Sequence, residues 1–190
     1  MLAFAPVSER MSESDRAAET VGLSVAYYGE TLTHPGAVVG GVFMPVHDAR
    51  VRHAMVVAPE LGGYVHPHNH RGLFAGAQVG YRFRADRRAR GFVFQVQGGV
   101  AYQHTWVAGP VYTRGPDGSI TSGRDRGRPS VRPSGSFGFG YDLAARGSIP
   151  LEPFVRVELH GRYPYNDYVL FGFAAQLGIV YRFALTGGRR

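Results

Sequence analysis

The chain of 190 residues has the length of a single domain, and it contains no cysteine. Disulfide scaffolds, structural zinc held by thiolates and catalysis by a thiol are therefore excluded. All 21 basic residues are arginines, and the formal net charge is +7. The arginines are scattered along the chain without a recognised nucleic-acid-binding module, so we expect no nucleic-acid partner. There are 27 glycines and 13% aromatic residues but only 18% charged residues, a composition that is unusual for a soluble helical domain.

The N-terminal segment MLAFAPVSERMSESD lacks the charged region and the full apolar region of a signal peptide. We expect the sequence to start after a removed signal peptide, or at an added Met1 of a shortened form. A protein that never leaves the cytoplasm is the alternative. Residues 1–18 are polar and without a period, which predicts an N-terminal tail or a short plug. No run approaches the roughly 18 apolar residues of a transmembrane helix, so a helical inner-membrane protein is excluded.

The rest of the chain follows a period of two, which predicts strands rather than helices. The last segment, FGFAAQLGIVYRF at 171–183, places large apolar residues such as Leu177 on one face and residues such as Gly178 and Arg182 on the other. Residues 107–133 are rich in Gly, Pro, Ser, Asp and Arg and lack an apolar period, which predicts one long loop. The predicted strands are 20–32, 37–47, 54–65, 72–84, 90–106, 134–144, 151–163 and 167–183, within a barrel over residues 19–184 that is followed by a C-terminal tail, residues 185–190.

Alternation alone does not distinguish a barrel with lipid outside from a soluble lipocalin-like or avidin-like barrel with a ligand inside. The polar face here consists mainly of Gly, Ala, Ser and Gln with single charges, which suits the narrow interior of an eight-stranded barrel. Aromatic residues lie near both ends of the predicted strands, as expected for girdles at two membrane interfaces. The pattern therefore favours an all-β fold, an eight-stranded antiparallel up-and-down transmembrane β-barrel.

Charged residues on the small-residue face predict a charge network inside this barrel. Buried charges must be paired, so we expect them to neutralise one another across a closed polar lumen that is too narrow for solute flux. With an even number of strands both termini lie in the periplasm, and the long loop then faces outward. The candidate lumen residues are Arg82, Asp142, Arg156, Glu158 and Arg182, with Glu60 as a further candidate.

The strand rhythm over residues 20–183 and the closing GIVYRF resemble the small eight-stranded outer-membrane proteins of Gram-negative bacteria, of the OmpA-like and OmpX-like kind. Tyr181 and Phe183 stand at the aromatic positions of the terminal signal that this family presents to the barrel assembly machinery. The family usually ends on the phenylalanine, whereas ALTGGRR follows it here. The resemblance implies a bacterial outer-membrane location, with outer-membrane lipid, lipopolysaccharide and the barrel assembly machinery as partners and with no cofactor.

Some small barrels are lipid A deacylases or acyltransferases, which place a histidine beside a serine and an orienting carboxylate. His104 and His160 are the weak catalytic candidates in this sequence, and Glu158 shares a strand face with His160. Thr105 follows His104 in place of a His-x-Ser arrangement, and no nucleophile in the sequence completes either candidate. We therefore expect a non-enzymatic protein, with a lipid A-modifying enzyme as the alternative.

The segment HPHNH offers His66, His68 and His70 at alternate positions. In an extended chain these side chains would project to one side and could bind zinc, copper or nickel. Pro67 and the exposed position make a weak, adventitious metal contact the simpler interpretation.

The predicted long loop contains Arg124, Arg126 and Arg128. Arginine pairs with phosphate bidentately, so these side chains could contact lipopolysaccharide phosphates if the loop is extracellular. A solvated loop is the alternative. The sequence as a whole predicts an envelope-structural or surface-binding role.

Overall fold

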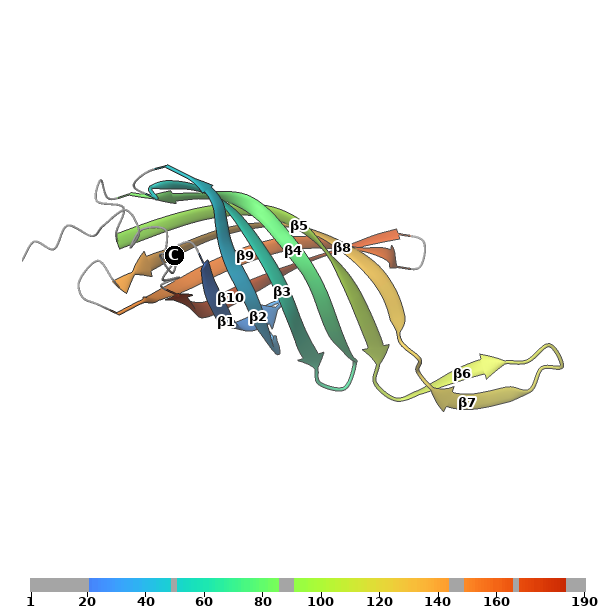
Figure 1. Cartoon of the computed structure of the whole chain (residues 1–190). Helices are drawn as coiled ribbons and strands as arrows, with labels where there is room; N and C mark the ends of the chain where they lie inside the picture. Colours follow the sequence, from blue (N-terminus) through green and yellow to red (C-terminus); the bar gives the residue numbers. More distant parts are fainter. Residues whose placement is uncertain (1–20, 49–50, 86–90, 144–148, 166–167, 184–190) are drawn as a thin grey trace, which may run out of the picture.

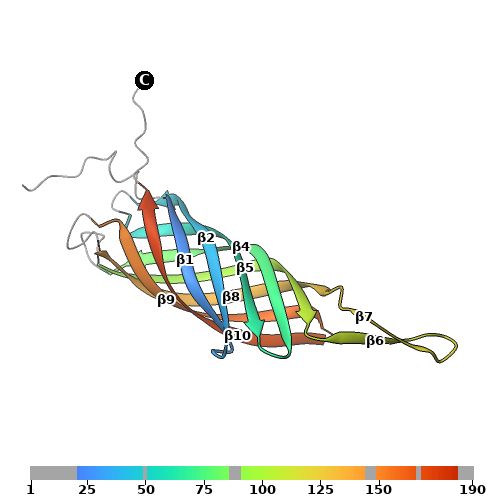
Figure 2. The same cartoon turned by 90° about the horizontal axis from the view of Figure 1, so that it is seen from below.

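Eight antiparallel strands of the computed structural model close into one barrel, drawn from two sides in Figure 1 and Figure 2. The structure describes residues 21–48, 51–85, 91–143, 149–165 and 168–183, so both predicted tails lie outside the described part. The described residues include no helix that is long and apolar enough to cross a membrane. The barrel strands are β1 (Val21–Glu30), β2 (His34–His47), β3 (His53–His66), β4 (His70–Arg84), β5 (Gly91–Val107), β8 (Arg128–Asp142), β9 (Leu151–Tyr165) and β10 (Tyr168–Phe183).

The ring closes between its first and its last strand. Strand β10 pairs with β1 from Phe183 opposite Val21 to Ala174 opposite Glu30, and every other barrel strand pairs with the one before it. A closed ring leaves no unpaired strand edge, which is what strands need in lipid, where no water is present to hydrogen-bond free backbone groups. The predicted all-β, eight-stranded, up-and-down barrel is confirmed.

The two ends of the barrel differ. The end at which β1 begins and β10 finishes, called the terminus end, carries the connections β2–β3, β4–β5 and β8–β9. The opposite end, called the hairpin end, has short turns at residues 31–33 and 67–69. Here β6 (Pro110–Arg114) and β7 (Ile120–Arg124) pair with each other and project away from the barrel, as Figure 1 shows.

The prediction of one long loop over residues 107–133 is wrong. Strands β6 and β7 lie within this range, and β8 begins at Arg128 rather than at residue 134. The hairpin is exposed on both faces except at Val111, so no buried side selects an apolar period in its sequence. The first half of β8 shows no such period either, because its buried inward residue is Arg132.

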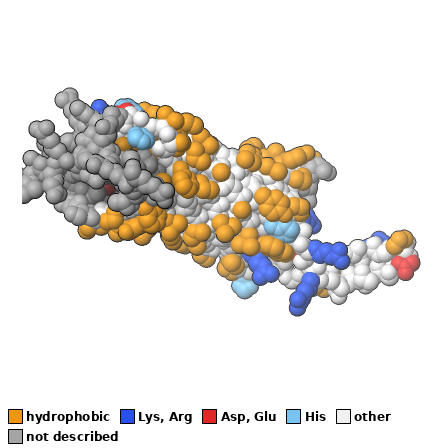
Figure 3. All heavy atoms as spheres, in the orientation of Figure 1, with side chains coloured by type: hydrophobic (Ala, Val, Ile, Leu, Met, Phe, Trp, Pro, Cys, Tyr) orange, Lys and Arg blue, Asp and Glu red, His pale blue; other side chains and the backbone are white. Residues whose placement is uncertain are grey.

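Large apolar side chains cover the outer surface between the two ends, as Figure 3 shows for one face. On β10 the predicted alternation is confirmed, since Leu177 is 63% exposed and the neighbouring Gln176 is 1% exposed. A soluble lipocalin-like barrel would place its polar residues outside and its apolar residues inside. The apolar outer surface is therefore the surface that contacts lipid, and the barrel is a transmembrane one.

Aromatic side chains on this surface lie near both ends. At the terminus end Phe83, Phe94 and Phe139 are register neighbours on three successive strands. At the hairpin end Tyr163 and Tyr168 are exposed near the adjoining ends of β9 and β10. Two such girdles match the two interfaces of a bilayer.

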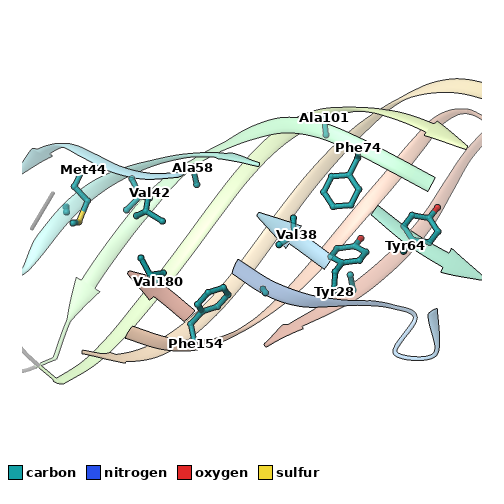
Figure 4. Packing of buried hydrophobic residues seen from close by; sticks show 14 of the residues in the cluster. Tyr28, Val38, Val42, Met44, Ala58, Tyr64, Phe74, Ala101, Phe154 and Val180 are labelled. Atoms are coloured by element: carbon teal, nitrogen blue, oxygen red, sulfur yellow. The ribbon is translucent and has the colours of Figure 1, made fainter. Parts of the chain in front are cut away.

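The interior combines polar groups with a cluster of buried apolar residues, shown in Figure 4. Tyr28 and Phe74 pack with ring centroids 5.2 Å apart toward the hairpin end, while Phe154 and Val180 lie toward the terminus end. Small residues make room for these side chains. A Cβ atom on Gly62 would lie 2.4 Å from Cζ of Phe74, so a larger residue there would displace the ring.

An arginine at Leu177 should destabilise the barrel, because this side chain faces lipid near the middle of β10. Arginine on the lipid face costs about 2–4 kcal/mol near the bilayer midplane. We expect Leu177→Arg to lower the free energy of unfolding by about this amount, measured by denaturant titration in phospholipid vesicles. Ile120→Arg is the control, since Ile120 is exposed on the hairpin beyond the barrel. An unchanged free energy for Leu177→Arg would contradict the lipid-facing assignment.

Candidate functional site

At the terminus end of the lumen, two arginines share one buried glutamate. Arg82 on β4 and Arg182 on β10 both donate to Glu152 on β9. Nη1 of Arg182 also lies 3.1 Å from Oδ2 of Asp142 on β8, and Nη1 of Arg84 lies 3.7 Å from the same oxygen. Four strands are thus connected across the bore by paired charges, as burial in a low-dielectric interior requires.

In the middle of the bore, Glu158 on β9 accepts a hydrogen bond from Arg132 on β8. The second carboxylate oxygen of Glu158 lies 3.2 Å from Nε2 of Gln78 and 3.3 Å from Nε2 of Gln176. The Arg132 guanidinium also lies 4.3 Å from the ring centroid of Phe74. Side chains from β4, β8, β9 and β10 therefore meet at one level of the lumen.

A second, looser pair lies beside this level. Nη1 of Arg156 on β9 is 3.9 Å from Oε2 of Glu60 on β3, and Oε1 of Glu60 accepts a hydrogen bond of 3.1 Å from Gln78. Gln78 donates to both Glu60 and Glu158, so it links the two pairs into one network.

Toward the hairpin end, the buried Glu30 on β1 gathers side chains from three other strands. Its Oε1 lies 3.7 Å from Nη2 of Arg162 and 3.8 Å from Nε2 of His160, both on β9. Its Oε2 lies 3.7 Å from Nδ1 of His34 on β2 and 4.0 Å from Nε2 of His70 on β4. Glu30 is therefore the negative centre of a polar cluster at the mouth of the lumen.

The candidate lumen residues all lie inside the barrel, but several of their partners were not selected from the sequence. The structure places Arg132 in the lumen, although the sequence pattern assigned it to the long loop. Glu152 alternates with outward residues on a predicted strand, so the alternation could have identified it as a lumen residue. Glu30 stands beside a turn, where the alternation ends. The candidates found buried are Arg82, Asp142, Arg156, Glu158 and Arg182.

His104, the first catalytic candidate, uses both ring nitrogens in local hydrogen bonds. Its Nε2 donates to the carbonyl oxygen of Arg126 at 3.1 Å, and its Nδ1 lies 3.0 Å from the hydroxyl of Tyr102. The ring packs on Trp106 with centroids 4.4 Å apart. These contacts attach the base of the hairpin to the outer face of β5 and leave neither nitrogen directed at a nucleophile.

His160, the second catalytic candidate, is buried among charges. Its Nδ1 accepts from Arg132 at 3.2 Å and lies 3.7 Å from Glu158, while its Nε2 faces Glu30. Ser134 is its register partner on β8, but the ring nitrogens are directed to charged groups rather than to a hydroxyl. The surroundings of His160 are those of an ion-pair network.

The three candidate metal ligands do not project to one side of an extended chain, so that prediction is wrong. The turn of residues 67–69 reverses the chain, and His66 and His70 face each other across it with ring centroids 5.3 Å apart. His68 is exposed at the tip, and the ring that packs on His66 is that of His34, at 3.8 Å. Within the described part of the chain, no group of three or more His, Asp or Glu side chains is arranged to hold a metal ion.

Asp125 fixes the base of the hairpin. Its Oδ2 accepts the backbone N–H of Val107 at 2.6 Å, and its Oδ1 accepts that of Gly127 at 3.1 Å. The hydrogen bond from Val107 holds the pKa of Asp125 below its usual value. Gly127 has a φ of 77°, and a Cβ atom on it would lie 2.1 Å from Nε2 of His104, so the position requires glycine.

The three arginines of the predicted loop are exposed at this base. Arg124 ends β7, Arg126 lies in the link to the barrel, and Arg128 begins β8. Figure 3 shows basic side chains gathered where the hairpin leaves the barrel.

The solved structures that this chain resembles include small outer-membrane barrels. The N-terminal β-barrel domain of Pseudomonas aeruginosa OprF matches with a TM-score of 0.52 and 16% identity, over 87% of this chain and 98% of that one. Neisserial surface protein A, NspA, matches with a TM-score of 0.52 and 13% identity, over 87% and 96% of the two chains. Neither a protein-family model nor a curated protein sequence matches the chain. The chain thus has the fold of the small eight-stranded outer-membrane β-barrels, as the sequence resemblance implied.

Removing the charge of Glu158 should destabilise the barrel, because Arg132 would keep a buried charge without its carboxylate partner. Breaking a buried pair in this way costs about 3–5 kcal/mol. We expect a loss of this size in the free energy of unfolding for Glu158→Gln. The double variant Glu158→Gln with Arg132→Met should recover most of it, and Asp117→Asn on the exposed hairpin turn is the control. A single variant as stable as the unaltered protein would refute the pairing.

Proposed function

We propose that this protein is a non-enzymatic integral barrel of the bacterial outer membrane, with an envelope-structural or surface-binding role and a closed lumen. The observation that carries the proposal is the division of the barrel into an apolar outer face and an interior of paired charges. An enzyme would need an accessible reactive group, and both histidine candidates are occupied by structural contacts.

Three levels of side chains support a lumen without a solute path. An eight-stranded barrel leaves an interior only just wide enough to be filled by side chains. Here the Glu152 cluster, the Glu158 cluster and the Glu30 cluster follow one another along the bore, and each joins strands from different sides of the ring. A porin-like channel would instead need a wider ring of strands.

The insertion and orientation that we propose rest on the last strand and on the side of the membrane at which both termini lie. The closing strand β10 presents Tyr181 and Phe183 outward, the arrangement expected of a signal read by the barrel assembly machinery. With both termini in the periplasm, the hairpin end faces the cell exterior. The β6–β7 hairpin then projects into the lipopolysaccharide layer.

The exposed arginines at the base of the hairpin are the groups that we propose to contact lipopolysaccharide phosphates. Arg124 and Arg126 lie beyond the end of the barrel, where headgroups rather than acyl chains surround the protein. A guanidinium matches a phosphate with two parallel hydrogen bonds.

Fractionation tests the proposed location. The chain, produced with a bacterial secretion signal, should appear in the outer-membrane fraction and should run faster in an unboiled than in a boiled detergent gel, because the closed barrel stays compact until heated. Recovery in the soluble fraction without detergent would overturn the proposal.

The lipopolysaccharide contact has a separate test. Exposed ion pairs contribute about 0.2–1 kcal/mol each, so losing two should weaken binding about two- to thirty-fold. We expect Arg124→Gln with Arg126→Gln to reduce the lipopolysaccharide retained by the purified barrel accordingly. Arg52→Gln removes a charge at the terminus end and should leave retention unchanged. Full retention by the double variant would show that these arginines do not bind the phosphates.

A further inference from the structure

A cavity of about 220 Å³ opens at the hairpin end, between the ends of β4, β5, β8, β9 and β10. Its polar lining includes Arg128 and Ser130 on β8, Arg162 on β9, His70 on β4, Thr105 on β5 and Asn69 in the turn before β4. The described residues that line it include no carboxylate. The cavity therefore offers hydrogen-bond donors and positive charge to whatever enters it.

The floor of the cavity is built by Arg162. Its Nη1 donates to the hydroxyl of Tyr64 at 3.1 Å, and the same hydroxyl accepts from the buried Gln103 at 2.9 Å. Nε2 of Gln103 also lies 3.2 Å from the hydroxyl of Thr105, which lines the cavity. This layer of side chains makes the cavity a cup with a closed bottom rather than the entrance of a pore.

Two nitrogens of the lining residues are buried and form no hydrogen bond to any described residue. They are Nε of Arg162 and Nε2 of His70. Both nitrogens lie within the floor rather than on the open surface of the cavity. Glu30 lies 3.7 Å from Arg162 and 4.0 Å from His70, and it offsets part of the positive charge from behind the floor.

The size and the apolar part of the lining narrow the class of ligand. Pockets for drug-sized molecules measure about 300–1,000 Å³, so this cavity fits one small unit rather than a chain of sugars. The lining also includes the ring of Tyr165 and the side chain of Leu170, which is the register partner of Arg162, and these apolar surfaces suit the apolar face of a sugar ring. Arg128 and Arg162 both line the cavity, and a guanidinium can match a phosphate with two parallel hydrogen bonds.

We propose that this cavity binds a phosphate monoester carried by a sugar. The sugar phosphate is either part of a lipopolysaccharide headgroup or free in solution. The site is separate from the exposed Arg124 and Arg126, and the inference does not rest on their contact with lipopolysaccharide.

The test uses the full chain folded in detergent micelles, with glucose 1-phosphate as the probe and calorimetry as the measurement. We expect saturable binding with one site per barrel, and no binding of glucose. Arg128→Gln should weaken the binding about ten-fold or more, because a hydrogen bond to a charged group contributes about 1.5–3 kcal/mol and 1.4 kcal/mol is a factor of ten. Arg124→Gln, which removes the same charge outside the cavity, should leave the affinity unchanged.

Three results would overturn the proposal: no saturable binding of glucose 1-phosphate, equal binding of glucose, or equal weakening by Arg124→Gln and Arg128→Gln. The source of the ligand is identified by repeating the glucose 1-phosphate titration with the barrel in nanodiscs that contain or lack lipopolysaccharide. Loss of glucose 1-phosphate binding when lipopolysaccharide is present identifies the headgroup as the ligand, and undiminished binding identifies a free sugar phosphate. Failure of Arg124→Gln with Arg126→Gln to affect lipopolysaccharide retention would leave these results intact, so the two proposals fail separately.

Discussion

The narrow bore of an eight-stranded ring is the constraint on which the rest of the structure depends. Outside the ring there is lipid, so the outward residues must be apolar, and inside there is room only for side chains. The period of two assigns each residue to one environment. A slip of one residue in the pairing of β10 with β1 would carry Arg182 into lipid and Leu177 into the bore. The inner charges and the outer apolar surface therefore specify the same register.

The charges inside the bore do not act as isolated pairs. Replacing a buried pair with apolar groups often stabilises a protein, so pairing alone is a weak argument for stability. In this barrel Arg132 donates to Glu158 and to Tyr28 and also stacks on Phe74, so one guanidinium on β8 contacts side chains of three other strands. A planar group with five donors is suited to such bridging, and a lysine at Arg132 would not be. The network connects strands across the ring that share no backbone hydrogen bonds.

The sequence was sufficient to predict eight barrel strands, their inner and outer faces and the closure of the ring, because the period of two runs through most of each barrel strand. It was insufficient for the contacts across the bore, because these depend on how the strands tilt and stagger around the ring. Glu30 and His70 meet for that reason, although they lie on strands that are not neighbours in the ring. The hairpin was missed because a strand pair without a buried face has no apolar period to detect, and Arg132 was lost with it.

The narrow bore also explains why the ligand binding that we propose lies at the hairpin end. The described charges within the lumen form pairs with one another, so a ligand that entered there would have to break a buried pair. At the mouth the ring no longer encloses its side chains, and β5, β8 and β9 continue past the level of Glu30. There the polar lining of the lumen meets open space. Arg162 is part of both the lumen network and the cavity, since it lies 3.7 Å from Glu30 on one side and lines the cavity on the other. The closed lumen and the binding cup that we propose therefore depend on one layer of side chains, because the layer that would block the bore is also the floor on which a ligand would rest.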